Sequence, residues 1–216
     1  MKDALCLRNK EDKGFNIVTL YGNTSSEAMD MVADAILRSR PGPFIVHVSS
    51  GGGSTIPARS IAELLNSYDV PVTWVSRGYN ASMAACLPHL GDGLRLCYKG
   101  SVFMYHARRY TMNGGDGELL QKFTVAKEEA DRTDEIIYKA IGLTKREYKR
   151  YNGEDIRLTA VEAMAVGKHG MLDGIIEKDY RDGRFLIQTR EGLKEIDVMI
   201  HRRKDLPTLP VINQGK

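Results

Sequence analysis

Three residues in the chain have the side chains of a hydrolytic triad: a serine, a histidine and an aspartate. Ser82 stands at an expected strand-to-helix turn, where the helix dipole and free N–H groups stabilise an oxyanion. His106 ends the apolar run VFMY, and Asp155 precedes the letters IRL. In such chemistry the histidine removes the serine proton, the hydroxyl attacks a carbonyl, and the carboxylate orients the imidazole.

Each of these residues also has a purely structural explanation. Serine is a favoured N-cap at any helix start, and Ser82 does not stand in the GxSxG elbow of α/β-hydrolases. A single histidine after a strand, such as His106, often has a structural role. Asp155 can equally be explained as a surface carboxylate that precedes a helix. A triad is defined by geometry, so the spacing leaves open whether the three side chains meet.

A glycine-rich turn, SSGGGS at 49–54, is the other chemical candidate. Tight turns between a strand and a helix need glycine for positive φ, which is the structural explanation. The turn lacks the lysine of GxxxxGK[ST] and does not match GxGxxG, so it is not a phosphate cradle. We interpret it as a backbone donor, since the N–H of Gly53 can face a developing negative charge without a side chain in the way.

The elements that would position these residues alternate in type over the first half of the chain. A capping box at Thr24 and Glu27 and a first-turn proline, Pro57, mark two helix starts. Short β-branched and aromatic runs predict strands between the helices, at 16–21, 44–48 and 70–76. This β-turn-α repetition predicts an α/β fold with a largely parallel sheet and crossover helices.

The second half has a different pattern, which predicts short strands at 94–97 and 102–105 and a long helix at about 118–141 that ends at Gly142. Capping boxes at Thr144–Glu147 and Thr159–Glu162 start two shorter helices. A strand at 170–176 and a β-hairpin at 184–200, around 190–192, follow them. The tail at 202–216 has no periodicity, so we expect it to be extended or disordered.

Composition excludes several classes of function. The chain has 216 residues, 42% hydrophobic and 27% charged, which is typical of one globular domain. A net charge of +3 gives no reason to expect a nucleic-acid partner. Three unpaired cysteines and scattered histidines predict no disulfide framework, metal or cofactor. A charged amino terminus and the lack of a long apolar run predict a cytoplasmic protein with no membrane span.

The order and spacing of motifs over about residues 16–176 resemble the ClpP family, the proteolytic subunit of the Clp proteases. The turn at 49–53 is similar to the family's NSPGG, and the interval from Gly53 to Ser82 matches that to the serine of its ASMG motif. Residues 104–106 are similar to its MIH motif. The remaining similar segments are 155–163, which resembles DRFLSAxEA, and 168–173, which resembles YGLVD.

This resemblance implies a ClpP/crotonase-like α/β fold, a superhelix of repeated β-β-α units with a long handle helix at 118–141. We therefore divide the chain into an N-terminal segment, a ClpP-like serine protease domain, a C-terminal β-hairpin extension and a flexible basic tail. These parts cover residues 1–15, 16–180, 181–201 and 202–216.

The resemblance also implies a serine endopeptidase with Ser82 as nucleophile, His106 as general base and Asp155 as the orienting acid. The backbone N–H groups of Gly53 and Met83 would form the oxyanion hole. The family encloses such sites in homo-oligomeric rings that degrade unfolded proteins or peptides. The sequence has no Walker motif, so ATP dependence would require a separate AAA+ ATPase.

The sequence departs from the family pattern at several positions. Gly51 replaces the proline of the turn, Ala84 replaces the glycine after Ser-Met, and Ala107-Arg108 replaces Gln-Pro. Such divergence resembles ClpP-like proteases of phages and mobile elements, some of which mature capsids. Two other hypotheses are a crotonase-type acyl-CoA enzyme, which needs no serine nucleophile, and a non-catalytic subunit of a ring or capsid.

Overall fold

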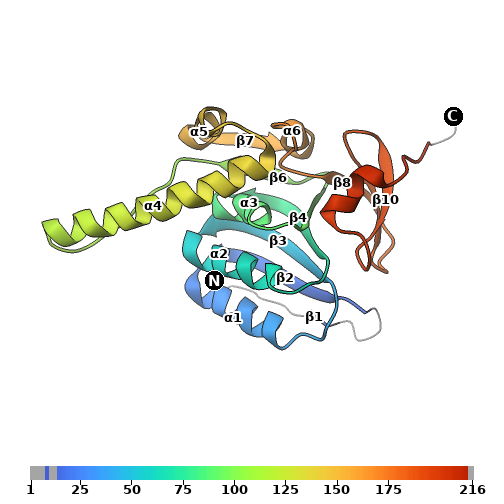
Figure 1. The fold of residues 1–216 in the computed structure, drawn as a ribbon, viewed down its shortest axis with the longest axis horizontal. Coiled ribbons are helices and arrows are strands. Elements are labelled where there is room, and N and C mark those ends of the chain that lie inside the picture. Colours follow the sequence, from blue (N-terminus) through green and yellow to red (C-terminus); the bar gives the residue numbers. More distant parts are fainter. Residues whose placement is uncertain (1–7, 10–13, 214–216) are drawn as a thin grey trace.

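The computed structural model describes residues 8–9 and 14–213 and builds them around one branched β-sheet (Figure 1). Its main path runs β1-β2-β3-β4-β5-β8-β9-β10, and β6 and β7 branch from β4. The strands are β1 (Arg8–Asn9), β2 (Asn16–Thr24), β3 (Phe44–Gly53), β4 (Val72–Ala81), β5 (Leu94–Tyr98), β6 (Val102–Tyr105), β7 (Ile156–Thr159), β8 (Gly174–Asp179), β9 (Arg184–Gln188) and β10 (Leu193–Asp197).

The helices follow the strands in the order that the sequence predicts. They are α1 (Ser26–Leu37), α2 (Thr55–Asn66), α3 (Met83–Cys86), α4 (Asp116–Ile141), α5 (Lys145–Gly153) and α6 (Ala160–Ala165), with 3-10 helices η1 (Leu87–His89) and η2 (Arg203–Thr208). Strands β2, β3, β4, β5 and β8 pair in parallel, so the predicted α/β class with crossover helices is confirmed.

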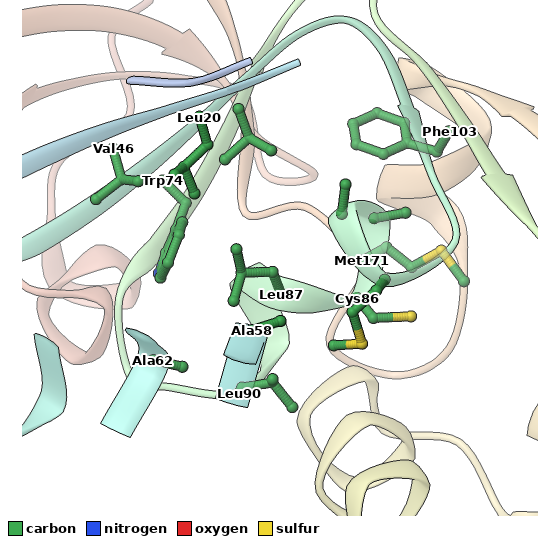
Figure 2. Packing of buried hydrophobic residues seen from close by; sticks show 14 of the residues in the cluster. Leu20, Val46, Ala58, Ala62, Trp74, Cys86, Leu87, Leu90, Phe103 and Met171 are labelled. Carbon is green, nitrogen blue, oxygen red and sulfur yellow. The ribbon is translucent and has the colours of Figure 1, made fainter. Parts of the chain in front are cut away.

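One face of the sheet packs against the helices and forms the larger core. Alternate side chains of the central parallel strands point to this face, among them Leu20 of β2, Val46 of β3 and Trp74 of β4. Leu87 and Ala58 meet them from the helical layer, as Figure 2 shows. These side chains are at most 4% exposed, so the sheet edge that bears the candidate site rests on a close-packed interior.

The opposite face of the sheet is covered by the C-terminal strands. Strand β8 pairs antiparallel with β9, and β9 with β10, so the segment predicted as a hairpin extension continues the main sheet. Ile187 and Ile196 from these strands are fully buried against Ile45 and Val75, which point away from the helical layer. The extension therefore contributes a second core.

The prediction of an extended or disordered tail is wrong for its first part, because Arg203–Thr208 form η2. Long-range polar contacts fix this segment: Arg203 binds Asp173, and Arg202 donates to Asp69 at 2.8 Å. The ammonium of Lys194, itself 1% exposed, donates to the carbonyl oxygen of Leu206 at 2.8 Å. Residues 214–216, and most of the predicted segment 1–15, lie outside the described residues.

Most helix-boundary predictions are confirmed, and one is wrong. The capping boxes at Thr144 and Thr159 form, and Gly142 ends α4 with a φ of 76°. Thr24 does not cap α1, because it is the last residue of β2 and the helix begins only at Ser26. Pairing with β3 holds Thr24 in the sheet, and that long-range contact overrides the local capping signal.

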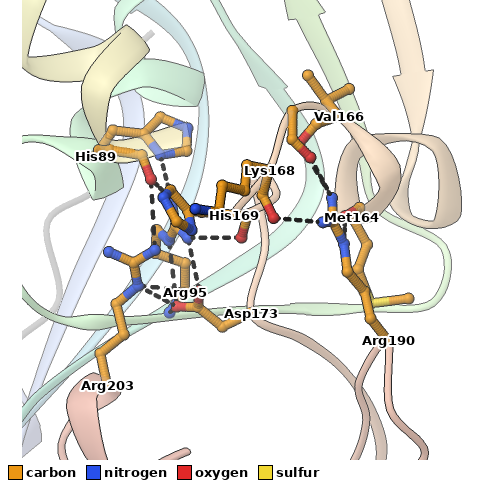
Figure 3. Close-up of polar contacts among 11 residues, drawn as sticks. His89, Arg95, Met164, Val166, Lys168, His169, Asp173, Arg190 and Arg203 are labelled. Atoms are coloured by element: carbon orange, nitrogen blue, oxygen red, sulfur yellow. Dashed lines mark hydrogen bonds and ion pairs between the residues drawn. The ribbon is translucent and has the colours of Figure 1, made fainter. Parts of the chain in front are cut away.

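A buried charge network joins β5 to the start of β8 (Figure 3). Arg95 is 1% exposed, and its Nη2 lies 2.6 Å from Oδ1 of Asp173. Arg203 approaches the same carboxylate at 3.0 Å, and His89 Nδ1 lies 3.0 Å from Arg95. Burial, together with the charges of Arg95 and Arg203, holds the pKa of His89 well below its usual value, so the imidazole is neutral.

A second arginine ties the β9–β10 turn to the region after β7. The guanidinium of Arg190 donates to four main-chain carbonyl oxygens, as Figure 3 shows for the three of Met164, Val166 and Lys168. The fourth acceptor is the carbonyl oxygen of Gly167 at 3.1 Å. These groups lie at and beyond the end of α6, where helix carbonyls lack intrahelical partners. Arg190 thus fastens the C-terminal strands to the α6 region.

Asp173→Asn tests the buried network. The change leaves the buried Arg95 without its anionic partner, so we expect the free energy of unfolding to fall by about 3–5 kcal/mol. Asp182→Asn breaks an exposed pair with Arg184 and is expected to leave stability almost unchanged. Urea unfolding followed by tryptophan fluorescence measures both, and equal effects of the two substitutions would contradict this role.

Candidate active site

Strand β4 brings the candidate residues together because it changes its pairing partner along its length. Its first part, Thr73–Ser76, pairs with β5, and its last part, Tyr79–Ala81, pairs with β6. Gly78, with a φ of 54°, lies between the two parts. The carboxyl end of β4 is therefore held beside the end of β6.

Ser82 comes directly after β4 and has a left-handed backbone, with a φ of 55°. Such a φ is strained for a residue with a side chain. The N–H of Ser82 donates to the carbonyl oxygen of Met104 at 2.8 Å, which fixes the residue against β6. Ser82 precedes α3, as predicted, but its side chain makes no capping hydrogen bond. The explanation of Ser82 as an ordinary N-cap therefore lacks support.

Strand pairing also places the backbones of His106 and Asp155 next to each other. Strands β6 and β7 are antiparallel, and their last registered pair joins Tyr105 to Ile156. His106 and Asp155 are the next residues outward on the two strands. The serine, the histidine and the aspartate thus lie at the ends of three consecutive neighbours, β4, β6 and β7.

The side chains themselves do not form a connected triad in this conformation. Nδ1 of His106 lies 2.6 Å from the carbonyl oxygen of Ala107. Among the described residues, 8–9 and 14–213, no hydrogen bond joins Ser82 to His106 or His106 to Asp155. Asp155 is exposed and does not line the cleft that holds the other two. The roles of the three residues accordingly stay predictions.

Two glycines of the predicted turn are required by close contacts. A Cβ on Gly52, whose φ is 94°, would lie 2.6 Å from the carbonyl oxygen of Ala81 and 2.7 Å from Cβ of Ser82. A Cβ on Gly53 would lie 2.6 Å from Oγ1 of Thr24. Gly53 was predicted from the sequence as a functional glycine, whereas Gly52 was not. The run of three glycines was the signal, but nothing local shows which one faces Ser82.

Ser82 and His106 open into a cleft with a volume of about 1050 Å³. Its inner wall is largely apolar and includes Met83, Cys86 and Tyr105. Burial raises the pKa of the Cys86 thiol to about 12, so this cysteine is a neutral wall residue rather than a nucleophile. Helix α4 and the loop after His106 form the outer wall.

Arg108 holds the outer wall of the cleft in place. From the sequence, this residue was noted only because it departs from a family motif. It pairs with Asp134 of α4 and donates to Oγ1 of Thr55 at 3.0 Å, at the start of α2. Burial acts to lower the pKa of Arg108, but the hydrogen bond and charge of Asp134 outweigh it and raise the pKa. Arg108 therefore remains charged and cross-links three elements around the cleft.

Two other features, a metal-binding cluster and a membrane-spanning helix, are absent from the described part of the chain. No group of three or more histidine, cysteine or acidic residues lies close enough there to hold a metal ion. No helix between Ser26 and Thr208 is both long and apolar enough to cross a bilayer.

Comparison with known proteins identifies the family of the chain. The sequence model of the family described as "Clp protease" matches residues 16–179. The chain belongs to the Clp protease family. A relative from Pleurastrum terricola, an "ATP-dependent Clp protease proteolytic subunit", is 24% identical over 111 residues, which cover 49% of this chain and 57% of that protein. The chain thus spans little more than half the length of that curated relative.

Gly52→Ala tests the contact between the glycine turn and Ser82. The added Cβ meets backbone atoms at a positive φ, so we expect the free energy of unfolding to fall by about 2 kcal/mol or more. Gly117→Ala, in α4 with open space around it, is the control and should stabilise the protein slightly. Similar denaturant midpoints for the two variants would show that the contact is not required.

Proposed function

We propose that this Clp protease family member is a serine endopeptidase that uses Ser82, His106 and Asp155. The observation that carries the proposal is the strained φ of Ser82 at the end of β4, beside the strand that bears His106. Strain of this kind persists only where the surrounding structure holds it, and it concentrates at functional sites. The family match over residues 16–179 supports the same activity.

The proposed reaction begins when Oγ of Ser82 attacks a peptide carbonyl carbon while Nε2 of His106 accepts the hydroxyl proton. His106 then protonates the leaving amine, and an acyl-enzyme ester remains on Ser82. Water, deprotonated by the same nitrogen, hydrolyses this ester and restores the serine. The contact between Nδ1 and the Ala107 carbonyl supports this role, because it keeps a proton on Nδ1 and leaves Nε2 as the base.

In this proposal Asp155 acts after a small rearrangement. The imidazole of His106 turns from the carbonyl oxygen of Ala107 toward the carboxylate on the neighbouring strand, which then stabilises the imidazolium. The register of β6 and β7 supports this assignment, since it leaves these two residues as adjacent strand ends. The exposure of Asp155 is consistent with a side chain that still has room to move.

We assign the oxyanion hole to the backbone N–H groups of Gly53 and Met83. Met83 is the first residue of α3, where an N–H has no intrahelical acceptor. The close approach of Gly52 to Ser82 supports the assignment, because it excludes any side chain from the space beside Met83 N. Two such donors stabilise the tetrahedral intermediate, and each contributes about 10²–10³ in rate.

The substrates we propose are peptides or unfolded chains, which a cleft of about 1050 Å³ accommodates. Assembly into a homo-oligomeric ring, with a separate AAA+ ATPase, is part of the same proposal. Helix α4 supports it, because it extends beyond the sheet in Figure 1 with Leu120 and Phe123 exposed. A capsid-maturation protease would share this chemistry and differ in its substrate. A crotonase-type acyl-CoA enzyme is disfavoured, because its chemistry does not need Ser82.

Covalent labelling tests the nucleophile. We expect a fluorophosphonate probe to label the wild type and not Ser82→Ala, since the probe forms a bond with an activated serine oxygen. Ser60→Ala, on the exposed side of α2, is the matched control and should keep full labelling. Intact-mass spectrometry measures the adduct. A folded wild type that takes up no probe, or labelling that survives in Ser82→Ala, would refute the proposal.

Asp155→Asn tests the orienting carboxylate. Because Asp155 is exposed and makes no contact that the fold needs, we expect unchanged stability and a fall in kcat of about 10³–10⁴-fold. Glu154→Gln removes the neighbouring exposed carboxylate and should leave kcat within about twofold, as for surface charges outside a site. Hydrolysis of a fluorogenic peptide measures both variants. Equal rates for Asp155→Asn and the wild type would remove Asp155 from the mechanism.

A further inference from the structure

The cleft beside Ser82 has an excess of positive charge. Four cationic residues line it: Arg59, Arg108, Arg109 and Lys122. Glu129 is the one carboxylate among its described lining residues. A concave site lined mainly by one sign of charge concentrates its field in the cavity, so the charge balance bears directly on which peptides enter.

Three of the four cations are neutralised by carboxylates of the chain itself. Nη1 of Arg59 lies 2.6 Å from Oε2 of Glu129. Arg108 pairs with Asp134, and Lys122 with Glu118 one turn earlier in α4. Each pair contributes little net charge to the cleft.

Arg109 differs from these three residues. It lines the cleft and is exposed, and it forms no ion pair with a carboxylate among residues 8–9 and 14–213. Arg109 is only three residues after His106, which limits their backbone separation to about 10 Å. An uncompensated positive charge therefore stands close to the base that would perform the cleavage.

The neighbouring Arg108 has one donor without an acceptor. Its Nε–H is buried and has no hydrogen-bond partner in the described chain, although its other nitrogens bind Thr55 and Asp134. A buried donor without an acceptor carries a desolvation penalty that natural structures usually avoid. A ligand oxygen reaches this donor only if the Arg108 side chain turns toward the cleft, so Arg109 carries the charge argument.

We infer that the cleft selects peptides with an acidic side chain near the bond to be cleaved, and that Arg109 is the specificity-determining residue. This inference rests on the proposed function and names its substrate class. The apolar inner wall, with Met83 and Tyr105, accommodates an apolar neighbour of the acidic residue. Arg109 binds the carboxylate, and Arg108 holds the wall that presents it.

Binding to Ser82→Ala tests the inference without turnover. Two fluorescein-labelled peptides of otherwise identical apolar sequence carry either Glu or Gln at the centre, and fluorescence anisotropy reports their affinities. In 50 mM salt we expect the Glu peptide to bind about fivefold more tightly, as a partly exposed ion pair contributes. The difference should narrow toward equality at 0.5 M salt, where the Debye length falls to about 4 Å.

Two further substitutions in the Ser82→Ala protein test which positive charge causes the preference for the Glu peptide. Arg109→Gln should remove the preference for Glu, whereas Arg150→Gln should retain it, because Arg150 is an exposed arginine of α5 outside the cleft lining. Equal binding of the two peptides, binding of neither, or a preference that survives Arg109→Gln would overturn the inference. Failure of probe labelling at Ser82 in the unmodified protein would refute the peptidase and leave this charge preference measurable.

Discussion

Strand β4 pairs with β5 over its first part and with β6 over its last part, and the candidate site depends on this change of partner. If β4 had stayed beside β5 along its whole length, the end of β6 would not accept the N–H of Ser82 at Met104. The β6–β7 pair then extends the same edge to Asp155. Three residues from distant parts of the chain thus stand at one edge of the sheet, where main-chain hydrogen bonds hold their strands together.

The position of Ser82 has a cost that the surrounding packing offsets. A left-handed φ at a serine costs about 1–3 kcal/mol of conformational strain. Gly52 lies so close to Ser82 that no side chain fits at position 52. Behind them, Met83, Ala84 and Leu87 are buried in the larger core, which prevents the turn from relaxing. Rigidity on the inner wall contrasts with the outer wall, where polar pairs such as Arg108–Asp134 hold α4.

Local patterns were sufficient to predict most elements and insufficient to predict how they meet. The capping boxes at Thr144 and Thr159 were predicted correctly because each involves only four consecutive residues. The tail prediction failed because η2 is held by Asp173 and Lys194, which no local pattern connects to it. The importance of Arg108 was missed for the same reason. The adjacency of Ser82, His106 and Asp155 came from the family resemblance and not from spacing, since strand pairing is a non-local property.

The contact made by Arg190 bears on how this chain tolerates sequence change. All four of its acceptors are main-chain oxygens, so the contact does not depend on which side chains stand at Met164, Val166 or Lys168. Drift in that loop is therefore compatible with an unchanged attachment of the C-terminal strands, whereas replacement of the single arginine removes every bond at once. The two sides of this junction are consequently under unequal evolutionary constraint. The contact itself restricts the arginine, whereas its partners are restricted only by other features, such as the burial of Val166 and the φ of 62° at Gly167.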